Sequence, residues 1–173
     1  MLYTKKGDGG TTQHLSSPTR VSKSSLQIEA LGELDELGAL LGVCTSWVDV
    51  ASRKYIERVQ QDLFVIQAEL AGANKQIGAD KTAWVEEVIG KIEIALPPIK
   101  TFLLAGGTQA SAFLDLARAV ARRAERRVVA LHEHAPLRPE LLAYMNRLSS
   151  LLYALARLSN NQSGITEKPP TYE

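Results

Sequence analysis

The sequence contains few of the residue types that build metal sites, disulfides or thiol chemistry. Its 173 residues include one cysteine and three histidines. Cys44 cannot form a disulfide within the chain and has no Cys or His nearby at metal-ligand spacing, so we expect a buried free thiol. His132 and His134 are two residues apart and would diverge on a helix. No metal ligands and no Ser–His–Asp centre are therefore predicted.

An excess of charge of one sign and long apolar runs are also missing. The 20 Lys and Arg residues are balanced by 19 Asp and Glu residues, for a net charge of +1. A protein that binds duplex nucleic acid normally carries a broad basic excess, so nucleic acid is not an expected partner. No apolar run approaches the roughly 18 residues of a membrane span, and the N-terminus does not resemble a signal peptide. We expect no membrane partner and a cytoplasmic location.

The residues that are abundant predict one helical domain over residues 1–173. Hydrophobic residues make up 45% of the chain, enough for a substantial core, and they recur at helical spacing. Residues 1–21 are rich in Gly, Ser and Thr and predict a loop with strand-like pieces, and residues 160–173 predict an irregular tail. Asp80 is expected to cap the third helix. The sequence thus predicts an all-α, five-helix bundle within residues 22–159, with helices at about 22–48, 51–75, 80–96, 109–133 and 139–159.

The fourth of these segments is rich in arginine. At about 100° per residue, Arg118, Arg122, Glu125 and Arg126 share one face of the helix, and Arg123 and Arg127 lie close by. The planar guanidinium suits phosphate and carboxylate groups. Local positive charge in a nearly neutral chain favours a small anionic ligand such as a nucleotide. The alternatives are a solvated face supported by weak i,i+4 pairs, or an ion-pair network with a partner.

Polar residues elsewhere point toward the same kind of ligand. The stretch from Tyr3 to Thr12 lacks the Gly-Lys-Ser/Thr of a P-loop, but its glycines allow backbone N–H groups to face an anion. The alternative is a flexible terminal turn. Asp35 is interpreted as a surface charge or as the partner of an arginine. In the fifth segment one polar face, suited to a ribose or an adenine edge, is predicted for Asn146, Ser149, Ser150, Tyr153 and Arg157.

Several motifs in order resemble one known family. The motifs are YTKKGDGGTT at 3–12, RVSK at 20–23, EALGELDELGALLG at 29–42, FLLAGG at 102–107, LARAVARRAER at 116–126 and YMNRLSSLLYALAR at 144–157. They resemble PduO-type ATP:corrinoid adenosyltransferases over nearly the whole chain. The resemblance implies a homotrimer with a site at each subunit interface. In that family, cob(I)alamin attacks the 5′ carbon of ATP and expels triphosphate to give adenosylcobalamin.

This chemistry is compatible with the absence of a catalytic Ser, Cys or His. Because Co(I) is the nucleophile, the protein has to orient ATP, stabilise the leaving group and prepare the cobalt. The resemblance also implies that Mg²⁺ accompanies the phosphates and that a flavin-dependent or other reductase supplies Co(I).

The resemblance implies a role for individual residues as well. Asp35 and Arg118 match an intersubunit salt bridge. Phe102 matches an aromatic residue that displaces the lower axial base of the corrinoid, leaving a four-coordinate Co(II) that is easier to reduce. Phe102, Arg122 and Asn146 are the predicted catalytic residues. The predicted ATP-binding residues are Thr4, Lys5, Gly7, Gly10, Thr11, Lys23, Arg122, Glu125, Arg126 and Asn146.

The sequence departs from the family pattern at four positions. Ala105, Asp115 and Ser150 stand where Pro, His and Asp are frequent, and Gly38 replaces a small polar residue. The ATP-binding set is intact, whereas corrinoid handling is expected to differ, with reduced activity or an altered corrinoid preference. Two alternatives to the adenosyltransferase remain: a noncatalytic homologue that carries or senses ATP or adenosylcobalamin, and a helical interaction protein whose arginines are purely interfacial.

Overall fold

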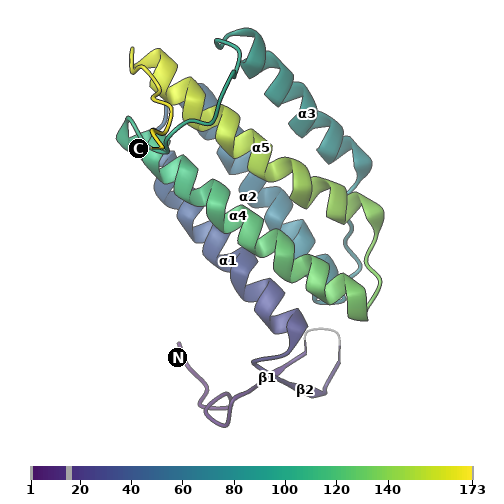
Figure 1. The fold of residues 1–173 in the computed structure, drawn as a ribbon. Coiled ribbons are helices and arrows are strands. Elements are labelled where there is room, and N and C mark those ends of the chain that lie inside the picture. The colour runs from purple at the N-terminus through teal and green to yellow at the C-terminus, as the bar shows by residue number, and fades with distance from the viewer. Residues whose placement is uncertain (1, 15–16, 173) are drawn as a thin grey trace.

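The computed structural model describes residues 2–14 and 17–172, and within these residues it contains a short hairpin followed by five helices (Figure 1). Strand β1 (Thr11–Gln13) pairs antiparallel with β2 (Arg20–Ser22). The all-α five-helix bundle with an irregular glycine-rich N-terminal segment is thereby confirmed. The helices are α1 (Leu26–Thr45), α2 (Val50–Leu70), α3 (Ala79–Ile94), α4 (Gln109–His134) and α5 (Pro139–Gln162).

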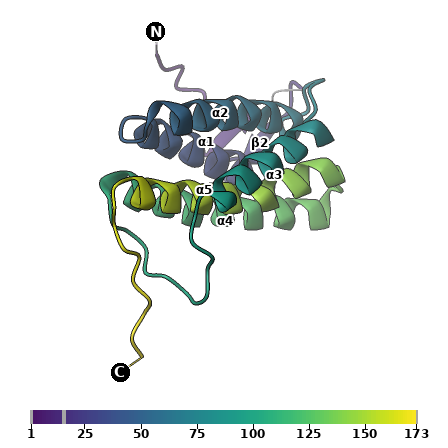
Figure 2. The same cartoon turned by 90° about the horizontal axis from the view of Figure 1, so that it is seen from above.

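The helices form two layers, with α1 and α2 in one and α4 and α5 in the other (Figure 2). Helix α4 packs against both α1 and α5, α2 packs against α1, and α3 packs against α5. The inward face of α4 contains the small residues Ala117, Ala121 and Ala124, all fully buried. Small side chains allow neighbouring helices to approach closely, so α4 is the central element on which α1 and α5 are placed.

Two helix starts differ from the sequence-based expectation. Helix α1 begins at Leu26 and not at 22, because the backbone of Ser22 is paired with Thr11 in the hairpin. Helix α3 begins at Ala79 with Gly78 in the N-cap position, so the prediction that Asp80 caps it is wrong. Asp80 instead lies in the first turn, where its negative charge complements the helix dipole.

Helix ends differ as well: α1 ends at Thr45 and not at 48, and α3 ends at Ile94 and not at 96. Glycine explains the ends of α2 and α5. Helix α2 ends at Leu70, short of the expected 75, because Gly72 adopts a left-handed φ of 83° and the Ala73 N–H donates to Ala68 O, a Schellman-type cap. Helix α5 continues through Gln162, beyond the expected 159, and is followed by Gly164 with φ of 66°. The tail therefore starts after the last turn of α5.

A buried polar cluster ties α2, α3 and α5 together. The Asp62 side chain on α2 is 2% exposed, accepts a hydrogen bond from Tyr144 Oη at 3.2 Å and pairs with Lys81 Nζ at 2.9 Å. Burial beside this carboxylate raises the pKa of the Tyr144 hydroxyl. Tyr144 therefore remains a neutral donor, and the cluster fixes the orientation of α5 relative to α2 and α3. None of the helices in the described part of the chain is long and apolar enough to cross a membrane.

Candidate functional site

The arginines of α4 divide into two sets with different partners. Arg123 lies 2.6 Å from Glu33 and also pairs with Glu36, while Arg127 lies 3.7 Å from Glu29. Hydrogen bonds to Glu36 and Glu33 raise the pKa of the Arg123 guanidinium. This set is neutralised by carboxylates of α1 and belongs to the contact between α1 and α4.

The second set lies on the side of α4 that meets α5. Arg122 and Arg126 line a hollow of about 300 Å³ together with Glu125, Val129 and Asn146. In the part of the chain that the structure describes, no carboxylate lies within ion-pair distance of Arg122 or Arg126. Two uncompensated guanidiniums in one hollow favour a small anion that bears several oxygens.

Asn146 is held in one orientation by its neighbours. Its Nδ2 donates to Glu125 Oε1 at 2.8 Å, and its Oδ1 accepts from Arg147 Nη1 at 2.6 Å. A carboxylate only accepts and a guanidinium only donates, so the two ends of the amide cannot be exchanged. Arg147 in turn donates to Glu86 Oε1 at 2.8 Å, which links α3, α5 and α4. Arg147 was not among the predicted site residues, and its position next to Asn146 in the sequence was the one signal for this supporting contact.

A second hollow of about 400 Å³ adjoins the first, because Arg122 lines both. Phe102 lies on the segment between α3 and α4 and is 80% exposed. The second hollow thus places an exposed aromatic ring and hydroxyl groups next to Arg122. It is lined by Ile99, Thr101, Phe102, Leu103, Arg118, Arg122, Ser149, Ser150 and Tyr153.

Asp115, one of the departures from the family pattern, contacts Arg118, which lines this second hollow. Its carboxylate is buried and accepts a hydrogen bond from the Gly106 N–H at 2.9 Å, and it lies 3.4 Å from Arg118 Nε. Gly106 has φ of 105°, a left-handed conformation that glycine adopts without strain. The guanidinium of Arg118 also lies 5.8 Å from the centre of the Tyr153 ring. Asp115 therefore connects the turn after Phe102 to the arginine face of α4.

Asp35 lies on another side of the bundle. It is exposed on α1 and lines a hollow of about 260 Å³ with Gln60, Leu63 and Phe64 of α2. Among the described residues, no cation lies within ion-pair distance of Asp35. Asp35 and Arg118 line different hollows, so one chain does not bring this predicted pair together.

The N-terminal residues predicted to bind phosphate form a compact group of their own. A Cβ atom added to Gly7 would lie 3.1 Å from Lys23 Nζ, and the Lys23 N–H donates to Gly10 O at 3.0 Å. Lys5 and Gly10 have φ of 59° and 76°, so the chain turns sharply between them. Thr4 and Thr11 flank this turn.

Arg20 on β2 fastens the turn to the hairpin, because its Nη2 donates to Lys6 O at 2.5 Å; its guanidinium also donates to Thr11 Oγ1 at 2.9 Å and to Thr11 O at 2.8 Å. The N-terminal segment leaves the bundle on the side of α1 and α2, away from α4 and α5 (Figure 2). No described residue of this segment lines the hollow of Arg122 and Asn146. The predicted ATP-binding residues therefore form two groups that a single chain holds apart.

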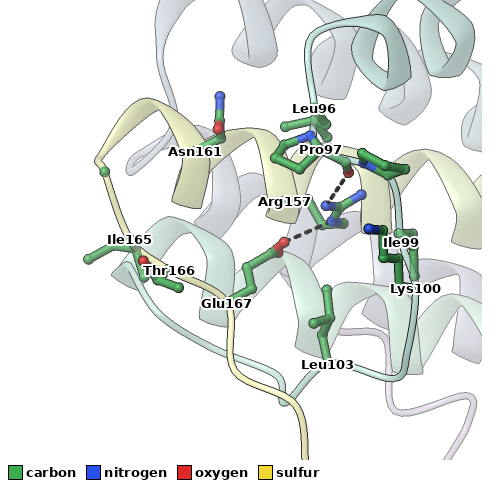
Figure 3. A pocket seen from close by; sticks show the side chains of 12 residues that line it. Leu96, Pro97, Ile99, Lys100, Leu103, Arg157, Asn161, Ile165, Thr166 and Glu167 are labelled. Carbon is green, nitrogen blue, oxygen red and sulfur yellow. Dashed lines mark hydrogen bonds and ion pairs between the residues drawn. The ribbon is translucent and has the colours of Figure 1, made fainter.

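The polar face predicted for the fifth helix is only partly present. Asn146 and Ser150 are exposed and Tyr153 is half-buried, whereas Ser149 and Arg157 are buried. Arg157 points into the contact between α5, the segment after α3 and the C-terminal tail (Figure 3). The prediction is wrong for Arg157, which two irregular segments cover, whereas the other four residues line the two adjoining hollows.

The geometry places a hollow lined by two unpaired guanidiniums next to a partly apolar one, an arrangement suited to a phosphorylated ligand beside an apolar group. The chain belongs to the cobalamin adenosyltransferase family, whose model matches residues 2–159.

Individual relatives agree with this assignment. The corrinoid adenosyltransferase PduO of Salmonella typhimurium is 39% identical over 170 residues, which cover 94% of this chain and 50% of that protein. The corrinoid adenosyltransferase of Bacillus subtilis is 35% identical over 95% of this chain and 89% of its own length. The chain spans about half the length of the PduO proteins that it matches.

A solved structure shows the same fold. A variant of the PduO-type ATP:corrinoid adenosyltransferase from Lactobacillus reuteri, complexed with cobalamin and ATP, superposes with a TM-score of 0.94 at 30% identity. The match covers 99% of this chain and 97% of that one.

Proposed function

We propose that this protein transfers the 5′-deoxyadenosyl group of ATP to the cobalt of cob(I)alamin, giving adenosylcobalamin and triphosphate. The observation that carries the proposal is the adjacency of two hollows that share Arg122, one lined by unpaired guanidiniums and the other by the exposed ring of Phe102. The names of the relatives and the cobalamin and ATP bound in the structural neighbour support it.

In this proposal ATP occupies the hollow between α4 and α5. Arg122 and Arg126 bind phosphate oxygens, and the Glu125 and Asn146 pair holds the nucleoside, since both side chains retain hydrogen-bonding capacity beyond their mutual bond. Mg²⁺ accompanies the phosphates. A neighbouring subunit contributes the N-terminal group to the triphosphate, namely Thr4, Lys5, Gly7, Gly10, Thr11 and Lys23.

The corrinoid occupies the hollow below Phe102. The ring projects from an irregular segment and is 80% exposed, so it is available to cover the lower face of a flat ligand. There it takes the place of the axial base and leaves four-coordinate Co(II), which a reductase then reduces. Ser150 gives this hollow a hydroxyl where the family often has a carboxylate, which reduces its negative charge.

The chemical step needs no nucleophile from the protein. The electron pair of Co(I) attacks C5′ of ATP, the cobalt–carbon bond forms, and the carbon–oxygen bond breaks with its electrons leaving on triphosphate. The work of the protein is to align the two reactants and to stabilise the charge on the leaving triphosphate. Arg122 is placed for both tasks because it lines both hollows.

A homotrimer completes the site in this proposal. Asp35 has no cation partner within the described chain, and the N-terminal group lies on a different side from Arg122. A second subunit that supplies Asp35 to Arg118 and the N-terminal group to the α4 and α5 hollow resolves both observations. We place the protein in the cytoplasm, where ATP and a flavin-dependent or other reductase are available.

Mixing the protein with ATP, Mg²⁺ and chemically reduced cobalamin tests the proposal. Formation of adenosylcobalamin, followed by its visible spectrum and by light-dependent cleavage, is the expected result. Binding of ATP without turnover would instead support the noncatalytic carrier. Absence of both would leave an interaction protein with interfacial arginines and would refute the proposed function.

A further inference from the structure

The segment that carries Phe102 has little regular structure of its own. It comprises residues 95–108, between α3 and α4, and contains no helix or strand. Backbone groups on both sides of Phe102 are nevertheless fastened to other parts of the molecule: Pro97 O accepts from Arg157, and Leu104 N donates to Lys168 O. The position of the ring therefore depends on these attachments.

Arg157 forms the first attachment and is itself buried. Its side chain is 7% exposed, its Nη2 donates to Pro97 O at 2.9 Å, and its Nε donates to Glu167 Oε2 at 2.9 Å. Figure 3 shows the guanidinium between the segment after α3 and the C-terminal tail, with both contacts drawn. Burying a charged group without a partner costs free energy. The folded state in which both segments contact the Arg157 guanidinium is therefore strongly favoured.

The tail forms the second attachment. Beyond Gly164 the chain runs back along the 95–108 segment, and the Leu104 N–H donates to Lys168 O at 2.8 Å. Glu167 precedes Lys168, so the ion pair with Arg157 places the carbonyl that Leu104 needs. Phe102 lies two residues before Leu104 and five after Pro97. The two attachments thus limit its movement from both sides.

We propose that Arg157 and Glu167 are positioning residues that hold Phe102 against the corrinoid through the C-terminal tail. This proposal rests on the proposed function. Neither residue lines the hollow of Phe102 or the hollow of Asn146, so neither is expected to touch the reactants. Their loss should affect the step that needs the ring, the preparation of Co(II) for reduction, more than the transfer of adenosyl to Co(I).

The chemistry of the contact calls for arginine. Its planar fork directs Nε and Nη2 toward two acceptors on different segments, whereas lysine offers one ammonium at a similar reach. We therefore expect Arg157→Lys to retain the charge but release one of the segments. Glu167→Gln keeps an oxygen acceptor for Arg157 and should retain part of the effect, while Glu167→Ala removes it.

Hydrogen exchange of the 98–104 segment gives the first readout, and it needs no activity. The Leu104 amide is the reporter, because its N–H donates to the tail. We expect Glu167→Ala to raise its exchange rate about tenfold, as for the loss of a charge-assisted contact, and to approach a chain truncated after Gly164. Lys168→Ala is the matched control, since the carbonyl that accepts from Leu104 is retained and its side chain is exposed. Circular dichroism confirms that each variant remains helical.

Two activity assays give the second readout. Starting from cob(II)alamin with a reducing system, Glu167→Ala and Arg157→Lys should be about tenfold to a hundredfold slower than wild type, with a weaker four-coordinate Co(II) signal. Starting from preformed cob(I)alamin, their rates should stay within about threefold of wild type, a difference smaller than the loss of one such contact. Glu167→Gln should be intermediate in the first assay.

The outcomes separate this proposal from the proposed function. Wild-type exchange at Leu104 in Glu167→Ala, or equal slowing of both assays in a folded variant, would overturn the positioning role. A wild-type protein that forms no adenosylcobalamin from cob(I)alamin would refute the proposed function, and with it the role toward a corrinoid. The exchange measurement would then still decide whether the tail fixes the segment.

Discussion

Removal of the Phe102 ring is the most discriminating test of the corrinoid side of the site. In the proposed mechanism the ring excludes the axial base, so Phe102→Ala should slow adenosylation strongly when the reaction starts from cob(II)alamin. The rate from preformed cob(I)alamin should change much less. The four-coordinate Co(II) absorbance should be lost as well.

The structure sets the expected cost in stability. Phe102 is 80% exposed. About a fifth of a phenylalanine surface of roughly 200 Å² is thus covered, about 40 Å², which at about 25 cal/mol per Å² contributes about 1 kcal/mol. Truncation of a core phenylalanine costs about 3–5 kcal/mol. The variant should therefore remain folded, and a shift in the denaturant midpoint consistent with about 1 kcal/mol is expected.

The assay compares both cobalt oxidation states on the same preparation, with unfolding measured alongside. Ile94→Ala is a suitable control, because Ile94 on α3 is also exposed, at 89%, but lines neither the hollow of Phe102 nor that of Asn146. A folded Phe102→Ala variant that still produces four-coordinate Co(II) would refute the proposed role of the ring. A loss of about 3–5 kcal/mol of stability, as for a core phenylalanine, would instead show that the ring packs against the bundle in solution.

Three further results are expected. Arg122→Ala should lose about 1.5–3 kcal/mol of binding or transition-state stabilisation, roughly ten- to a hundredfold in ATP affinity by calorimetry or in rate by kinetics. Arg53→Ala on α2 should behave as wild type. Unchanged affinity and rate in Arg122→Ala would remove Arg122 from the site. Asp35→Ala and Arg118→Ala should each weaken the trimer in sedimentation velocity, and the double variant should be little worse than either single one; unchanged assembly and turnover in both single variants would rule out the salt bridge. Burial raises the pKa of the Cys44 thiol to about 11, so only about 0.1% of the thiol is thiolate at pH 8. Alkylation should therefore be slow until the pH approaches this pKa or the protein unfolds. Rapid labelling of the native protein at pH 8 would contradict the burial.

The helices were accessible to sequence reasoning because their apolar spacing is strong. The helix boundaries were harder to predict, because they depend on contacts with other segments that the spacing of apolar residues does not show. Ser22 belongs to a strand because it pairs with Thr11. Asn160 remains in α5, where its side chain accepts a hydrogen bond from Thr108 N and donates one to Gly106 O. In both cases the contacting residues lie elsewhere in the sequence.

The candidate site was predictable in its residue types and less so in their arrangement. Helical geometry correctly placed Arg122, Glu125 and Arg126 together, and they line one hollow. The same geometry failed for Arg157, since a helical wheel shows which residues share a face but not which irregular segment covers that face. The roles of the site residues remain predictions.

The separation of the N-terminal group from the arginines of α4 has a genetic consequence. In the proposed trimer each site takes one part from each of two subunits, so a chain with a defective Lys23 and a chain with a defective Arg122 are each inactive alone. When the two are mixed and reassembled, some interfaces combine two intact halves and others combine two damaged ones. Alleles of the two classes should therefore complement each other in one cell, while two alleles within the same class should not.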